Sequence, residues 1–204
     1  MKFVTFKRLL IGALVTEWDD LRMLLHRGRT IFEHGIPEHF LGYVLEGKTP
    51  IILLSGLHAH WSKLRRIGDH ISLNGHPLYV VESLKRNFID IPSSAKMLHE
   101  FVEENKIKEA IIIAHSKGGM IGKYYLAHFN KDNRVKGLIA IATPFSGTEI
   151  ARVLGRRIHR LRELETDSEL VTDLKKHSEV NSKIISIYPD DDPVVWAGEK
   201  FWRR

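Results

Sequence analysis

Short apolar runs alternate with longer amphipathic stretches along most of this chain, and that alternation limits its fold more than any other feature. The five runs are Pro50–Ser55, Pro77–Ser83, Ala110–Ala114, Gly137–Ala142 and Lys183–Tyr188. Each is almost continuously hydrophobic, as expected of a strand buried on both faces of a parallel sheet. Helices are predicted around them at residues 60–74, 93–106, 117–130, 149–163 and 167–177. This order predicts right-handed crossovers in a doubly wound, mainly parallel α/β sheet.

The residues before the first run predict a separate N-terminal segment. Apolar positions recur at helical spacing over residues 5–32, and Gly35 and Pro37 mark the exit from the helix. We therefore expect a helical segment over residues 1–45 and an α/β core over residues 46–204.

This first helix begins with a pattern that imitates a signal peptide. Lys7 and Arg8 precede the apolar residues Leu9–Val15, but acidic residues follow in place of a small-residue cleavage site. The apolar run is also far shorter than the ~20 residues that span a bilayer. An ordinary helix and a cytoplasmic location are therefore expected.

The composition excludes several kinds of chemistry. No cysteine occurs among the 204 residues, which removes disulfides, thiolate metal sites and a cysteine nucleophile, and fits a reducing compartment. The formal net charge of +6 favours anionic surfaces, but the basic residues lack the interleaved aromatic residues of a single-strand nucleic-acid platform. Neither nucleic acid nor a cofactor is expected as a partner, and the oligomeric state stays open.

The third apolar run leads into a candidate nucleophile. In a doubly wound sheet, ligands bind beyond the carboxyl ends of the strands, and there this chain reads AHSKGG over Ala114–Gly119. A nucleophile elbow needs a sharp strand-to-helix turn with small residues two positions before and after the serine, which Ala114 and Gly118 provide. Ser116 is therefore predicted to be a nucleophile, with the helix N-terminus directed at a developing oxyanion.

Two other interpretations of this turn are simple packing and phosphate binding at a helix N-terminus. Its position between a buried strand and an amphipathic helix favours the elbow. His115 is not expected to act as the base, because a neighbour of the serine on a sharp turn points away from it. We interpret His115 as a supporting residue.

The sequence around the turn resembles the small bacterial lipases and esterases of the α/β-hydrolase superfamily, some of which carry the same Ala-His-Ser-x-Gly-Gly elbow. Further segments resemble the family in the same order: Pro50–Leu57 with Trp61 and Gly75–Ser83, Lys136–Thr148, Leu164–Leu174 and Ile185–Val195. The resemblance covers about residues 48–196. It implies hydrolysis of a carboxylic ester, small or lipid, through an acyl-enzyme on Ser116. A deacylase or thioesterase on the same scaffold is the alternative.

The resemblance also implies the remaining site residues. Asp192 in Asp-Pro-Val-Val matches the triad acid, although a solvated acidic turn would give the same pattern. The oxyanion donors would be the backbone amides of Leu57 and Lys117. Where the family usually has His-Gly, this chain has Ser55-Gly56, and a backbone donor tolerates that change.

The triad base is missing from its expected place. In the family this histidine follows the acid, whereas all 12 histidines of this chain precede Asp192. We expect the sequence to be a fragment whose sheet lacks its final strand. The alternatives are that another histidine serves, or that the chain is a non-catalytic binding protein of the same fold.

Two further patterns could indicate a metal site and a membrane-binding helix. His58 and His60 are spaced like part of a metal site, but no third ligand is evident, so no metal is expected. Residues 149–164 form an amphipathic pattern whose polar positions include Arg152, Arg156, Arg157 and Arg160. A surface helix that packs on the sheet is favoured, and peripheral contact with an anionic membrane is the alternative.

Overall fold

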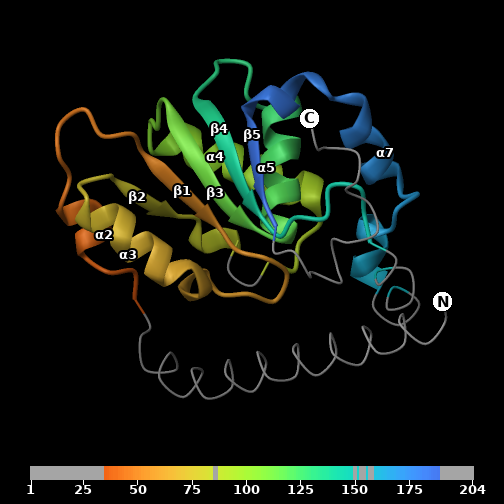
Figure 1. Cartoon of the computed structure of the whole chain (residues 1–204), viewed down its shortest axis with the longest axis horizontal. Coiled ribbons are helices and arrows are strands. Elements are labelled where there is room, and N and C mark those ends of the chain that lie inside the picture. Colours follow the sequence, from red (N-terminus) through yellow and green to blue (C-terminus); the bar gives the residue numbers. More distant parts are fainter. Residues whose placement is uncertain (1–34, 85–86, 149–150, 152–154, 156–158, 189–204) are drawn as a thin grey trace.

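The computed structural model describes residues 35–84, 87–148, 151, 155 and 159–188 (Figure 1). They form one parallel sheet of five strands in the order β2-β1-β3-β4-β5. The strands are β1 (Ile51–Leu54), β2 (Leu78–Val80), β3 (Ala110–His115), β4 (Val135–Ile141) and β5 (Ile184–Ile187). Each of the five apolar runs overlaps one strand, although β4 begins two residues earlier than predicted, and the predicted doubly wound parallel α/β sheet is confirmed.

Helices lie on both faces of this sheet. The α-helices are α2 (His39–Gly42), α3 (Arg65–Leu73), α4 (Ile91–Glu104), α5 (Lys117–His128) and α7 (Glu169–Lys176). Short 3₁₀ turns are η1 (Trp61–Leu64), η2 (Glu82–Leu84), η3 (His159–Leu164) and η4 (Glu179–Lys183). In Figure 1, α2 and α3 cover one face of the sheet, and α4 and α5 cover the other. In such a sheet a ligand site is expected beyond the carboxyl ends of the strands.

Alternate residues of each central strand enter different cores, as the two-residue period of a strand requires. In β1, Ile52 and Leu54 join the core under α4 and α5, while Ile51 and Leu53 join the core under α2 and α3. Phe40 of α2 is fully buried in the second core. Part of the predicted N-terminal segment therefore packs on the sheet.

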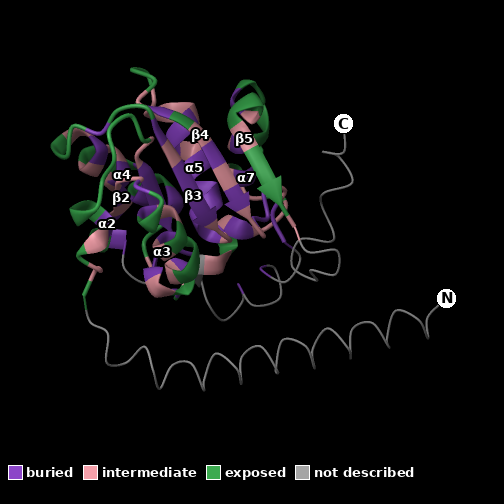
Figure 2. Cartoon of the chain, turned by 60° about the vertical axis from the view of Figure 1, so that its left-hand side comes forward, coloured by how far each residue is buried: buried purple, intermediate pink, exposed green. Residues whose placement is uncertain are grey.

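The prediction that every strand is buried on both faces is wrong for β5. Ile185 is 63% exposed and Ile187 is 49% exposed, and β5 is the exposed arrow at the side of the sheet in Figure 2. The reason is its place at the edge of the sheet, where β4 is its only strand partner among the residues described. An apolar run alone does not distinguish an edge strand from a central one.

Several predicted features lie outside the described residues. They include the helix over 5–32, the acidic residues 190–192, and Arg152, Arg156 and Arg157. Arg160 lies in η3, but the environment of its side chain is not described. Within the part of the chain that is described, no helix has the length and apolar character needed to cross a membrane.

Candidate active site

Three loops meet at the carboxyl end of the sheet. They follow β1, β3 and β4, and because the strands are parallel these ends share one edge. The amide of Ser116 donates to the carbonyl of Ile141 at 2.9 Å, which joins the end of β3 to the end of β4. The amide of Ala142 donates in the same way to Ile187 of β5.

Ser116 has a strained backbone between β3 and α5. Its φ is 52° and its ψ is −124°, a conformation that costs a residue with a side chain about 1–3 kcal/mol. Hydrogen bonds fix it from several sides. Besides the Ser116 amide, its carbonyl accepts from the amide of Gly119 at 2.9 Å and from the buried hydroxyl of Thr143 at 3.0 Å. This is the sharp strand-to-helix turn that the sequence predicted.

Two glycines allow the backbone segments around Ser116 to approach one another. A Cβ atom on Gly118 would lie 2.6 Å from the carbonyl oxygen of Leu54, closer than any real contact. One on Gly56 would lie 3.0 Å from the Cβ of Ser116. The loop after β1 is therefore adjacent to the serine.

That loop is held in place by side chains. The hydroxyl of Ser55 donates to the carbonyl of Ala59 at 2.7 Å, and the buried amide side chain of Asn87 donates to the carbonyl of Ser55. Ser55 occupies the position that is usually histidine in the resembling lipases, and here it closes the loop from within. His58 has a φ of 55°, so strain is present in this loop too.

Two backbone amides, one on the loop after β1 and one directly after Ser116, have no acceptor among the described residues. Leu57 lies in the loop after β1, and its amide has no acceptor there. Lys117 is the first residue of α5, so its amide has no acceptor within the helix. These are the two donors predicted for the oxyanion hole.

A profile of the alpha/beta hydrolase fold family matches residues 49–167, which is more than half of the chain and includes β1, β3, Ser116 and β4. The chain belongs to the α/β-hydrolase family. A comparison with curated protein sequences found no match.

Solved structures of lipases share this α/β-hydrolase fold. The mature lipase BlEst2 of Bacillus licheniformis is 18% identical with a TM-score of 0.56, over 76% of this chain and 69% of that one. A soluble variant of monoglyceride lipase from Saccharomyces cerevisiae is 17% identical with a TM-score of 0.53, over 74% and 71%. Phospholipase PlaB from Legionella pneumophila is 16% identical with a TM-score of 0.53, over 70% and 38%. At these identities the similarity concerns the fold.

The side chain of Lys117 extends away from the strand ends into the protein. Its Nζ donates to the carbonyl of Ile89 at 2.6 Å and lies 2.6 Å from Oε1 of Glu163, and only 1% of the side chain is exposed. Glu163 also accepts from the amide of Ile91, the first residue of α4. The ion pair thus joins the α5 N-terminus, the α4 N-terminus and η3. Sequence reasoning missed this pair, because Lys117 and Glu163 are far apart in the chain.

α5 carries a second buried lysine that the sequence analysis did not identify. Lys123 is 2% exposed, and its Nζ lies 5.5 Å from the ring centroid of Phe145 in the loop after β4. Burial lowers the pKa of Lys123 to about 8, and the carboxylate of Glu179 opposes this effect.

The predicted acid, Asp192, lies outside the described residues. The two histidines in the loop after β1 each contact another side chain. His58 is exposed with its ring 4.4 Å from that of Phe88, and Nδ1 of His60 lies 3.0 Å from the hydroxyl of Ser62. His128 is at the far end of α5, about 18 Å along the helix axis from Ser116, which excludes it as a base.

Proposed function

We propose that this chain is a serine hydrolase that cleaves carboxylic esters, with Ser116 as its nucleophile. The observation that supports this best is the strained backbone of Ser116, held by three hydrogen bonds at the start of α5. Such strain persists only where the surrounding structure enforces it, and it is typical of functional positions.

In the proposed reaction, Ser116 Oγ attacks the ester carbonyl and forms a tetrahedral intermediate. The amides of Leu57 and Lys117, together with the positive end of the α5 dipole, would stabilise its oxyanion. One preorganised donor of this kind contributes roughly 10²–10³ in kcat. The alcohol then leaves with a proton, and water releases the acyl group from Ser116.

The proposed reaction also needs a general base that takes the proton of Ser116. Asp192 is proposed as the residue that orients an imidazolium, as in the Ser-His-Asp arrangement. No histidine follows Asp192 in this sequence. His58 and His60, in the loop after β1, are the histidines to test as a substitute base.

An ester with an acyl chain is the proposed substrate class. The structural neighbours are named as a lipase, a monoglyceride lipase and a phospholipase. A shallow hollow beside the oxyanion loop is lined by Leu53, Ser55 and Trp61 among others, but Ser116 does not line it. We therefore base the substrate class on the elbow and the family, and not on this hollow.

The test is covalent labelling of Ser116. The purified chain would be treated with a fluorophosphonate probe, and the labelled peptide identified by mass spectrometry. Ser116→Ala should abolish both labelling and any p-nitrophenyl ester hydrolysis without lowering the melting temperature. Ser83→Ala, at an exposed serine after β2, is the matched control and should label normally. Equal labelling or turnover of Ser116→Ala would refute the proposal.

A further inference from the structure

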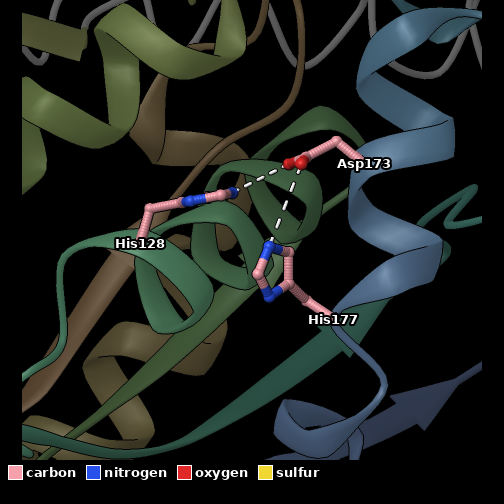
Figure 3. Close-up of side chains that lie close together, drawn as sticks. All are labelled: His128, Asp173 and His177. Carbon is pink, nitrogen blue, oxygen red and sulfur yellow. Dashed lines mark hydrogen bonds and ion pairs between the residues drawn. The ribbon is translucent and has the colours of Figure 1, made fainter.

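A second group of reactive side chains lies where the end of α5 meets α7. His128 is the last residue of α5, Asp173 lies in α7, and His177 follows directly after α7. Figure 3 shows the carboxylate of Asp173 facing both imidazole rings, with a dashed line to each. Because His128 is at the opposite end of α5 from Ser116, this group is separate from the candidate active site.

The spacing of the three side chains approaches that of metal ligands. His128 Nε2 lies 2.8 Å from Asp173 Oδ2, and His177 Nε2 lies 3.9 Å from Asp173 Oδ1. One ligand atom from each residue lies within 4.8 Å of both others. Ligands of a tetrahedral zinc ion are about 3.3 Å apart, so side-chain shifts of about 1 Å would suffice.

His177 is already oriented as a metal-binding histidine would be. Its Nδ1 lies 2.9 Å from Oε1 of Glu179, so the proton on Nδ1 is donated to that carboxylate. The lone pair is then on Nε2, the atom that faces Asp173. A carboxylate on the outer nitrogen is the usual partner of a histidine that binds a metal.

Asp173 has different neighbours from Asp69, which forms the other histidine–aspartate pair among the described residues. His39 and Asp69 are 3.1 Å apart with similar exposure, but there Arg65 also contacts the carboxylate, at 3.3 Å. In the described part of the chain, Asp173 is paired with two imidazoles and with no lysine or arginine. This carboxylate and the two imidazoles together offer one oxygen and two nitrogen ligands to a cation. The three side chains are 29–37% exposed, so an ion has access.

We propose that His128, Asp173 and His177 bind a divalent transition-metal ion, for which zinc is the best match. Two imidazoles and one carboxylate suit zinc, whereas magnesium prefers oxygen ligands. Water would fill the fourth position. To bind through Nε2, the His128 ring must carry its proton on Nδ1, so the proton that Nε2 now shares with Asp173 is exchanged through solvent.

The proposed ion would join α7 to the end of α5. α7 is followed by η4 and then β5, the exposed edge strand. An ion at this point would therefore hold the outer side of the sheet in place. Its effect should appear in stability and not in the chemistry at Ser116.

The experiment uses the full chain, freed of metal with EDTA and returned to a chelator-free buffer. Zinc is added in a calorimeter and in thermal melts, with magnesium as the comparison ion. We expect one zinc per chain and a rise in melting temperature of about 5–10 °C at 100 times the dissociation constant. Cobalt in place of zinc should give visible absorption bands, which report its ligands directly.

Three variants decide whether these residues are the ligands. His177→Gln and Asp173→Asn should each lower zinc affinity at least tenfold while the metal-free melting temperature stays near that of the wild type. His39→Gln, which breaks the other histidine–aspartate pair, should bind zinc normally. Three results would overturn the proposal: no stoichiometric zinc uptake, undiminished affinity in both ligand variants, or an equal effect of magnesium. If either ligand variant fails to fold, the cobalt spectrum of the other decides.

Discussion

Removal of Glu163 should destabilise the fold strongly, because it leaves the buried ammonium of Lys117 without its carboxylate. The Nζ of Lys117 contacts the Glu163 carboxylate and the Ile89 carbonyl, and Glu163→Ala leaves only the carbonyl. The same change removes the acceptor of the Ile91 amide. Breaking a buried ion pair costs about 3–5 kcal/mol. The Glu163 side chain is 17% exposed, so water reaches the pair and we expect about 3 kcal/mol.

Urea unfolding followed by circular dichroism measures this loss, and thermal melts should show a decrease of about 6–12 °C for a chain of this size. Glu104→Ala, at an exposed glutamate that ends α4, is the matched control and should change stability by less than about 0.5 kcal/mol. The double variant Lys117→Met/Glu163→Gln removes both charges but keeps an oxygen for the Ile91 amide. It should recover more than half of the loss.

A free energy of unfolding for Glu163→Ala within about 0.5 kcal/mol of the wild-type value would refute this prediction. It would also be refuted if the double variant were as unstable as the single one. In that case the loss would come from packing or from the Ile91 amide, and not from an uncompensated buried charge.

Three more predictions concern α5 and the site. The pKa of Lys123 is about 8, against an ordinary 10.5, so the unfolded chain binds more protons between these values and stability should rise with pH there. Lys123→Met should remove that rise and add up to about 3 kcal/mol at pH 7, as measured by urea unfolding at pH 7 and 9.5. Gly118→Ala, which places a Cβ 2.6 Å from the Leu54 carbonyl, should cost about 1–3 kcal/mol and slow fluorophosphonate labelling at least tenfold. Finally, the rate of ester hydrolysis by this chain should not exceed the rate in water by more than about 10³–10⁴-fold. A faster rate that is abolished by His58→Ala or His60→Ala would identify that histidine as a substitute base.

The sheet was predictable because its signal is local. A buried parallel strand needs a continuous apolar run, and each of the five runs overlaps one strand. The turn at Ser116 was predictable for the same reason, since Gly118 marks a close approach within two residues of the serine. The exposed edge position of β5 was not, because strand order depends on contacts between distant segments.

Pairs formed across the fold were also beyond the reach of sequence reasoning. Lys117 meets Glu163, and His128 meets Asp173 at a separation of 45 positions. Local spacing drew attention to His58 and His60, where no metal was expected, whereas the proposed ligands lie at the end of α5, within α7 and directly after it. An i,i+4 pair such as Asp173 and His177 is common on helices, and only its proximity to His128 makes it notable.

The backbone of Ser116 has a consequence for the stability of this chain. Its φ of 52° suits glycine, which adopts such values without steric cost. Glycine at position 116 would therefore relieve the strain. This gain would offset much of the larger backbone entropy that glycine loses on folding. Under the proposed function, serine at this position has a cost in stability that glycine could not remove without also removing the nucleophile.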